Sequence, residues 1–321
     1  MTLKNPVNCI CLALMALTAP CFSFAGDQLT VSPAVSVSRD ADGGLVVSGG
    51  DCAALERQAT ALSDWRKRLG EVAGPADACR CAVQDCSLRI SAAAPEFVNL
   101  THGTKAGRWG PNCWNTALAA NEILAARRFT SPEEMTFWMK SPLCRALRAG
   151  EKPQPGDIVA IRGQAGEEEH GFVYLTPELS FSKNYLTVAA PYALQSPEEV
   201  YAEFPVTPAC RKPGSSGSGC AAYSDYFRCT TLADHQQASP GPQDEEYLRA
   251  AAAVSSAEAA ISDLAIRWKT DPDLKNHAAE ILAAQEKALL PVRQLAQARS
   301  GFYWSALLLR VDSLLHQISL I

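Results

Sequence analysis

The spacing of hydrophobic residues predicts helices near both ends of the chain. Between residues 52 and 69 an apolar side chain recurs every three or four positions, at Leu55, Ala59, Leu62, Trp65 and Leu69. This spacing predicts a helix with one packed face. Beyond residue 243 the composition shifts to Ala, Leu, Glu and Gln, and the same spacing returns near 261–268, 274–282 and 307–318. Asp271-Pro272-Asp273, Pro291 and Gly301 divide this region, so we expect a helical hairpin or three helices.

Between these helical regions the apolar positions predict strands and two further helices. Short alternating runs on either side of Asp42-Gly43-Gly44 are typical of a hairpin. Strands are expected near 157–162, 170–175 and 179–188, with Thr176-Pro177-Glu178 joining the last two. Helices should precede them, at 114–128 and at 131–148, the second opened by Ser-Pro-Glu-Glu.

The first 25 residues have the pattern of a secretory signal peptide. Lys4 precedes the mostly apolar stretch 10–24, and Ser23-Phe24-Ala25 places small residues at a cleavage site after Ala25. We therefore expect a secreted or periplasmic protein with no membrane span in the mature chain. The formal net charge is −5, or −6 once Lys4 is lost. This balance gives no reason to expect nucleic acid or anionic lipid as a partner.

The cysteine count supports the same compartment. Of twelve cysteines, nine lie after residue 25: Cys52, Cys79, Cys81, Cys86, Cys113, Cys144, Cys210, Cys220 and Cys229. Secreted chains oxidise thiols in pairs, so four bridges would leave one thiol free. We expect the first four to pair among themselves and the last three to close loops, with Cys144 taking the remaining partner. The spacing of Cys79, Cys81 and Cys86 is not that of a zinc site, and the compartment favours disulfides, so we expect no metal. We also expect no cofactor.

Cys113 is the cysteine with a chemical reason to stay free. Gly110-Pro111 is a breaker pair and Asn112 is a favourable N-cap residue, which would put Cys113 at the first helical position. There the unpaired amides and the positive end of the helix dipole favour thiolate over thiol. The other interpretation is one more half of a disulfide.

A histidine follows at the start of a predicted strand. Pro155-Gly156-Asp157 opens one strand and His170 begins the next. A helix-tip cysteine and a strand-borne histidine are the parts of a thiol nucleophile and its base. His102, which precedes Cys113, is the alternative base.

These residues together resemble the NlpC/P60 superfamily of papain-like cysteine peptidases and amidases, to which the CHAP amidases are related. The resemblance covers roughly residues 97–201 and depends on Asn112-Cys113, Pro155-Gly156-Asp157, His170 and Phe181-Ser182-Lys183-Asn184. It implies an α+β fold with a cysteine-bearing helix packed on an antiparallel sheet, and a third polar residue that orients the histidine. This sequence departs from the family in having Asn112 and Trp114 beside the cysteine.

The predicted hairpin suggests which residue is the third. If the loop has three residues, Leu175 pairs with Leu179 and His170 lies opposite Asn184. Ser182 and Asn184 would then share the face of His170, while Lys183 points away. A change of one residue in the loop would put Lys183 there instead. Asn184 could accept the imidazole N–H and fix the tautomer, as the third member of a triad does.

The predicted function is a secreted cysteine hydrolase that cleaves peptide or amide bonds, with peptidoglycan stem peptides as the expected substrate. Cys113 attacks, His170 is the base, and the Cys113 backbone N–H stabilises the oxyanion with help from Asn112 or Trp114. We expect residues 26–96 to form a disulfide-rich region, 97–229 the papain-like catalytic domain, 230–243 a linker and 244–321 a helical region. That last region is either a strap packed on the catalytic domain or a surface for a protein partner or self-association.

Two other functions are compatible with the sequence. The same residues permit acyl transfer or transpeptidation when an amine outcompetes water. The chain could also be a non-catalytic envelope binding protein that uses its disulfides for durability.

Overall fold

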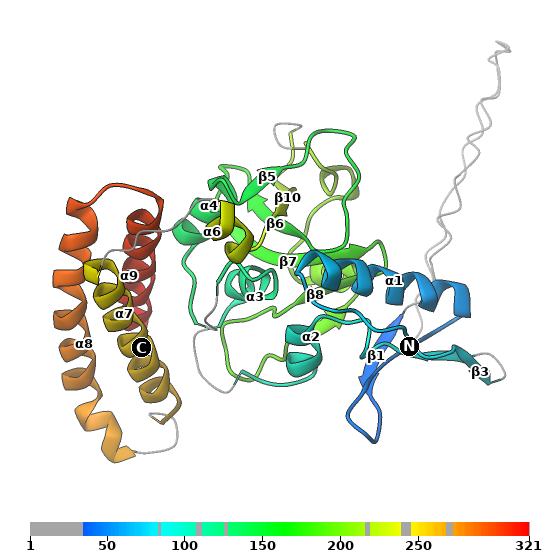
Figure 1. Cartoon of the computed structure of the whole chain (residues 1–321), viewed down its shortest axis with the longest axis horizontal. Helices are drawn as coiled ribbons and strands as arrows, with labels where there is room; N and C mark the ends of the chain where they lie inside the picture. Colours follow the sequence, from blue (N-terminus) through cyan, green and yellow to red (C-terminus); the bar gives the residue numbers. More distant parts are fainter. Residues whose placement is uncertain are drawn as a thin grey trace, which may run out of the picture. The chain divides into compact units, whose positions relative to one another are not determined.

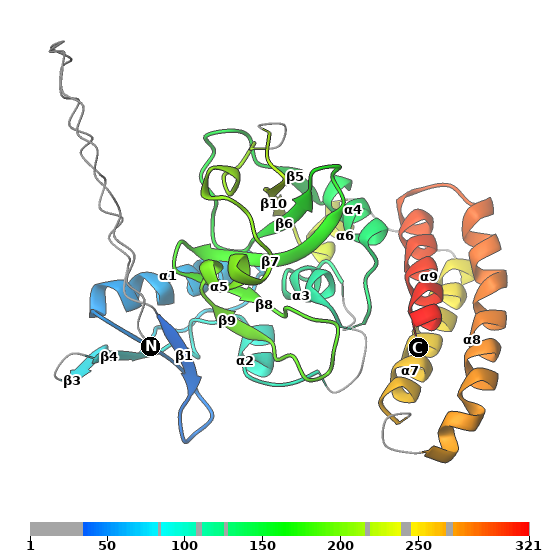
Figure 2. The same ribbon diagram turned by 180° about the vertical axis from the view of Figure 1, so that it is seen from behind.

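The computed structural model describes residues 35–82, 85–106, 111–124, 128–215, 219–238, 245–267 and 272–320. The predicted signal peptide lies outside these residues. Pro33–Ile321 forms one compact unit by its internal contacts. The architecture is mixed, with two antiparallel sheets and helices, and the last three helices pack together (Figures 1 and 2). The predicted α+β class is confirmed at this level.

The N-terminal region forms a small four-stranded sheet in the order β1-β2-β4-β3. The predicted hairpin is present as β1 (Ser36–Arg39) and β2 (Leu45–Gly49), followed by β3 (Arg80–Ala82) and β4 (Asp85–Arg89). Helix α1 (Cys52–Arg68) is N-capped by Asp51, whose carboxylate accepts the Ala54 N–H at 2.7 Å. Its apolar face buries Leu55, Leu62 and Trp65 in the main core, as the spacing predicted.

The larger sheet carries the candidate site and has the order β5-β10-β6-β7-β8-β9, with all neighbours antiparallel. Its strands are β5 (Cys144–Ala146), β6 (Asp157–Gly163), β7 (Glu168–Thr176), β8 (Leu179–Ser182), β9 (Ala193–Gln195) and β10 (Ala222–Cys229). On one face, α3 (Cys113–Ala120) and α4 (Pro132–Lys140) bury residues such as Leu118 and Met135 against Val173 and Phe181. On the other, Phe172 packs with Val200 of α5 (Pro197–Glu203), which Figure 2 shows beside β8 and β9.

Several predicted boundaries are wrong for identifiable reasons. The first predicted helix ends at Ala120, because Asn121 is its C-cap and Glu122 has a φ of 54°. The second ends at Lys140, since Pro142 follows and disfavours helical geometry at Ser141. Residues 144–146 are therefore strand β5 rather than helix.

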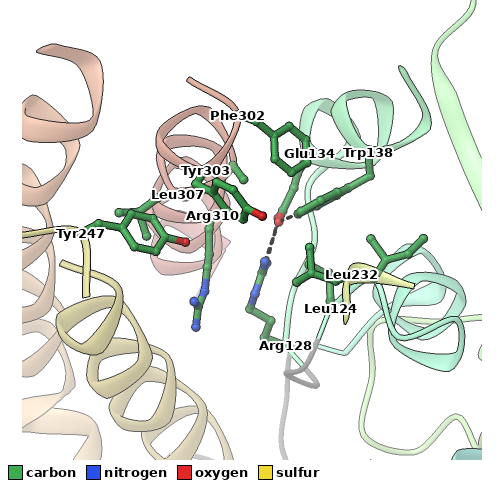
Figure 3. A pocket seen from close by; sticks show the side chains of 12 residues that line it. Leu124, Arg128, Glu134, Trp138, Leu232, Tyr247, Phe302, Tyr303, Leu307 and Arg310 are labelled. Carbon is green, nitrogen blue, oxygen red and sulfur yellow. Dashed lines mark hydrogen bonds and ion pairs between the residues drawn. The ribbon is translucent and has the colours of Figure 1, made fainter. Parts of the chain in front are cut away.

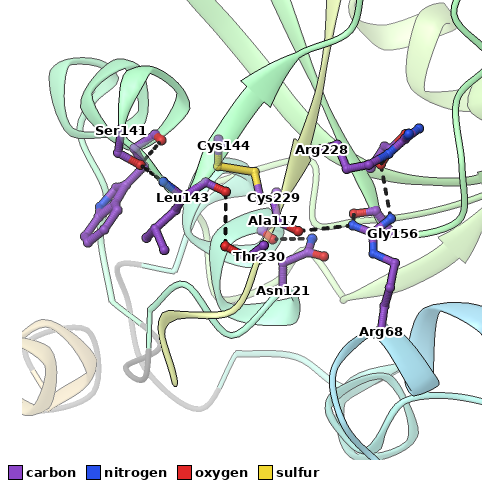
Figure 4. Close-up of a disulfide and its surroundings, with 12 residues drawn as sticks. Arg68, Ala117, Asn121, Ser141, Leu143, Cys144, Gly156, Arg228, Cys229 and Thr230 are labelled. Carbon is purple, nitrogen blue, oxygen red and sulfur yellow. Dashed lines mark hydrogen bonds and ion pairs between the residues drawn. A yellow bond between two sulfur atoms is a disulfide. The ribbon is translucent and has the colours of Figure 1, made fainter. Parts of the chain in front are cut away.

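Four disulfides are present, as the cysteine count predicted. They join Cys52 to Cys79, Cys81 to Cys86, Cys144 to Cys229, and Cys210 to Cys220. Figure 4 shows the bridge from Cys144 to Cys229, which links β5 to β10 where the two residues are directly paired. Beside it the Thr230 N–H donates to the Leu143 carbonyl at 2.9 Å. This bridge closes the longest loop of the four, with a separation of 85 residues.

The C-terminal region contains α7 (Glu245–Arg267), α8 (Pro272–Ala298) and α9 (Phe302–Leu320), drawn in yellow, orange and red in Figure 1. Their apolar faces share a core that includes Val254, Leu289 and Val311. Pro291 lies inside α8 instead of dividing it. Part of the predicted linker is helix α6 (Leu232–Ala238). No helix among the described residues is both long and apolar enough to cross a bilayer.

Candidate active site

Cys113 lies at the first position of helix α3, where the sequence predicted it. Asn112 is the N-cap, and its side-chain oxygen accepts the Asn115 N–H at 3.1 Å. The Asn112 amide also donates to the Thr130 carbonyl at 2.7 Å, which ties the helix start to the loop before α4. Among the nine cysteines after residue 34, all of which the structure describes, Cys113 is the one that is not in a disulfide. The predicted free thiol is confirmed.

The electrostatic expectation for this thiol is wrong in its net direction. Cys113 is 8% exposed, and burial raises its pKa to about 11. The backbone N–H groups of Gly171, Trp114 and Cys113 itself oppose this rise, as does the positive charge of Lys183. The helix start therefore acts as predicted, but desolvation of a buried thiolate outweighs it.

His170 is fully buried on strand β7, and its imidazole stacks on Phe204 with ring centroids 3.9 Å apart. It lies beside Phe172, whereas Gly171 faces helix α3: a Cβ at Gly171 would be 3.0 Å from the Trp114 ring. Burial lowers the His170 pKa to about 3, so the ring is neutral. No hydrogen bond joins the Cys113 thiol to the imidazole, and the His170 Nδ1 atom has no partner in the described structure.

The predicted third residue reaches His170 only through Ser182. His170 Nε2 and Ser182 Oγ are 3.1 Å apart, and Ser182 Oγ donates to Asn184 Oδ1 at 2.7 Å. Because the serine proton is used in that second bond, Nε2 must carry the imidazole proton, which leaves Nδ1 with a free lone pair. Asn184 donates in turn to Glu203 at 2.7 Å. Ser182 thus shares the face of His170, as predicted.

The hairpin explains this partial agreement. Val173 pairs with Phe181 and Tyr174 with Ser180, which is the predicted register. The turn itself has two residues instead of three, because Thr176 pairs with Leu179 and a bulge follows. Strand β8 ends at Ser182, so Asn184 lies beyond the ladder and not directly opposite His170.

Lys183 is the residue that the sequence interpretation placed away from the site. Its side chain is fully buried, and its ammonium donates to the carbonyls of Tyr185 and Thr187, the latter at 2.9 Å. Burial lowers its pKa to about 8, and the Cys113 charge opposes that shift.

The remaining candidates do not join this group. His102 is buried elsewhere, where its Nδ1 accepts the Leu194 N–H at 2.9 Å. The sulfur atoms of Cys52, Cys79, Cys81 and Cys86 all lie within 4.8 Å of one another, a geometry that could hold a metal ion. As two disulfides they offer no thiolate for one.

A separate cavity of about 160 Å³ lies between α4 and the C-terminal helices (Figure 3). Its walls include Trp138, Tyr247, Phe302 and Tyr303, together with Arg128, Glu134 and Arg310. The charges in it are paired within the protein: Arg128 with Glu134 at 2.5 Å and with Glu258 at 2.9 Å. Neither Cys113 nor His170 lines this cavity, so it is distinct from the candidate active site.

No family model matches the chain, and neither a curated protein nor a solved structure is found to be similar to it.

Proposed function

We propose that this protein is a secreted or periplasmic cysteine hydrolase of the NlpC/P60 type, with a papain-like core, that cleaves peptide or amide bonds. The observation that carries the proposal is the state of Cys113. It is a reduced cysteine in a chain whose eight other cysteines after residue 34 are paired, and it occupies the first turn of a capped helix packed against a strand. The disulfides suit an oxidising compartment, in which a thiol without a partner needs a reason to persist.

The mechanism begins with attack of the Cys113 thiolate on a carbonyl carbon, which forms a C–S bond and moves the π electrons onto oxygen. The backbone N–H groups of Gly171, Trp114 and Cys113 act on the sulfur, and those at the start of α3 would stabilise that oxyanion. Collapse expels the amine, which takes up a proton, and leaves a thioester on Cys113. Water then attacks the thioester, the acid is released, and the sulfur recovers its proton.

The substrate class follows from the predicted compartment and the net charge. The negative net charge of the chain gives no reason to expect nucleic acid as the substrate, whereas peptides are available outside the cytoplasm. We propose peptidoglycan stem peptides as the natural substrate. The same intermediate would give acyl transfer if an amine instead of water attacked the thioester.

The test is digestion of purified peptidoglycan, with soluble fragments and newly exposed amino groups as readouts. The wild-type protein should release fragments, and Cys113→Ser should release none while keeping its thermal unfolding midpoint, because Ser matches Cys in shape. A C113S variant that digests as well as the wild type would overturn the proposal.

A non-catalytic, disulfide-stabilised envelope binding protein is the second candidate. It is favoured by the burial of the thiol, which is 8% exposed, and by the lack of a hydrogen bond between Cys113 and His170. It predicts that the wild type and C113S pull down with insoluble peptidoglycan to the same extent and that neither digests it.

A further inference from the structure

The two disulfides of the N-terminal region lie against each other. One joins Cys52 to Cys79 and the other joins Cys81 to Cys86, yet the Cys52 and Cys81 sulfur atoms are only 3.3 Å apart. All four sulfur atoms lie within 4.8 Å of one another. Disulfides exchange by attack of a thiolate on a disulfide sulfur. A thiolate formed at Cys81 would therefore already contact a sulfur of the other bridge.

Strand pairing brings the four cysteines together. Cys81 on β3 is directly paired with Cys86 on β4, and Cys86 is paired in turn with Gly49 of β2. Cys52 is the first residue of helix α1, which follows β2, and Cys79 immediately precedes β3. The sheet register therefore places the four side chains in one group, in addition to the covalent bonds between them.

One side of this cluster is open to solvent. Cys81 is exposed on β3, which is an edge strand of its sheet, and Cys52 and Cys79 are half-buried. The Cys86 side chain is buried. A dissolved thiol therefore reaches Cys81 first, and attack on that sulfur expels Cys86 as the thiolate.

The start of helix α1 suits the charge that develops when the two bridges exchange. In attack by Cys81 on Cys52, the Cys52 sulfur is the central one of three that share the negative charge. Cys52 is the first residue of a 17-residue helix capped by Asp51, where unpaired amides and the helix dipole favour negative charge. Because Cys52 is half-buried, desolvation opposes this effect less than it does at the buried Cys113.

We propose that Cys52, Cys79, Cys81 and Cys86 form a thiol–disulfide exchange centre whose substrate is the thiol of a peptide or small molecule. A substrate thiolate attacks Cys81, forms a mixed disulfide and expels the Cys86 thiolate. A second substrate thiolate attacks the substrate sulfur of that mixed disulfide, which releases the substrate disulfide and the Cys81 thiolate. Cys81 then attacks Cys52, forms a Cys52–Cys81 bond and expels the Cys79 thiolate.

These steps balance. Two substrate thiols are oxidised to one disulfide, and one protein disulfide is reduced to the thiols of Cys79 and Cys86, which take up the two protons. The last step also gives the centre a direction, because it removes the exposed Cys81 thiolate that would reduce the product again. The centre uses no residue of the candidate active site, so this inference is independent of the proposed hydrolase.

The first experiment tests exchange between the bridges without any substrate. Cys86→Ala leaves Cys81 as a thiol 3.3 Å from Cys52, and Cys79→Ala leaves Cys52 as a thiol 3.3 Å from Cys81. Each purified variant is incubated in mildly alkaline buffer, quenched with acid and mapped by mass spectrometry of non-reduced peptides. We expect the same new Cys52–Cys81 bridge to form in both variants.

The matched control is Cys220→Ala, which releases Cys210 from its bridge. Among the described cysteines, no third sulfur gathers with this pair. We expect its three remaining bridges to keep their native pairing. Circular dichroism establishes that each variant is folded.

The second experiment uses the wild-type protein with reduced glutathione as the thiol probe. The reaction is quenched with iodoacetamide at short times, and the labelled cysteines and remaining bridges are mapped. We expect oxidised glutathione to form, label on Cys79 and Cys86, and a Cys52–Cys81 bridge.

Two results would overturn the proposal. The first is exclusively native bridges in folded C86A and C79A. The second is wild-type protein in which glutathione leaves label on Cys81 and Cys86 while the Cys52–Cys79 bridge persists. This second result requires no variant to fold, and neither result bears on digestion of peptidoglycan by the wild type and C113S.

Discussion

Replacing Arg128 with methionine removes the charge that compensates Glu134, a carboxylate with no exposed surface. Glu134 accepts hydrogen bonds from both terminal nitrogens of Arg128, at 2.8 and 2.5 Å, and from Ser313 Oγ of α9 at 2.6 Å. Methionine preserves much of the volume of the arginine stem but none of its donors. The buried carboxylate then keeps only neutral partners.

Breaking a buried ion pair by removing one partner costs about 3 to 5 kcal/mol of folding free energy. For a chain of this size, each kcal/mol lowers the thermal midpoint by about 2 to 4 °C, so R128M should melt about 6 to 20 °C below the wild type. The matched control is Arg293→Met, which breaks the half-exposed pair of Arg293 with Asp312 at 2.6 Å. Such pairs contribute about 0 to 1 kcal/mol.

The pH dependence of the folding stability gives a second test of this ion pair. Burial would raise the pKa of Glu134, but Arg128 holds it below its ordinary value of 4.5. The stabilisation from this carboxylate is therefore fully present above pH 4.5 and is lost as pH falls through the depressed folded value. In R128M burial acts without that compensation and raises the Glu134 pKa, so protonation on acidification relieves the penalty. The difference in stability between wild type and R128M should shrink as pH falls.

The assay is urea unfolding followed by circular dichroism at several pH values. An R128M free energy of unfolding within about 1 kcal/mol of the wild type at pH 7 would refute the reasoning, because that is the range of an exposed pair. A difference that grows on acidification would refute it too.

Two further substitutions test the packing and the covalent closure. In Gly171→Ala the new methyl group would lie 3.0 Å from the Trp114 ring and 3.5 Å from Met135. We therefore expect overpacking to lower the free energy of unfolding in urea by about 1 to 3 kcal/mol. An unchanged urea midpoint would show that α3 does not pack tightly on β7 at this position. The double variant Cys144→Ser, Cys229→Ser opens a loop of 85 residues. The chain-entropy estimate for that loop is about 4 to 5 kcal/mol, and a loss below about 1 kcal/mol would contradict it.

Local chemistry in the sequence was sufficient to predict where helix α3 begins and that Cys113 is a free thiol. The N-cap preference of Asn112 acts within one helical turn. The odd number of cysteines after the signal peptide predicts one free thiol without any knowledge of contacts. The end of the same helix was not predictable in this way. It depends on Glu122, whose positive φ has no sequence signal in a residue of that type.

The hairpin shows where alternation suffices and where it does not. Period-two alternation correctly put Ser182 on the face of His170. Alternation does not predict which face of the sheet helix α3 covers, because that depends on tertiary packing. Helix α3 packs on the side of Gly171. Strands β5 and β9 were missed because each is only three residues long, and β10 because its partners β5 and β6 are distant in sequence.

The central claim is that Cys113 is a nucleophile that forms a thioester. The most direct measurement is intact-mass and peptide-mass analysis of the purified protein after brief exposure to a peptide p-nitrophenyl ester, which acylates a nucleophilic thiol. The account predicts a single acyl adduct on Cys113, removable by hydroxylamine and absent in C113S. An unmodified Cys113 in folded wild-type protein, in which the same thiol reacts only after unfolding, would contradict it.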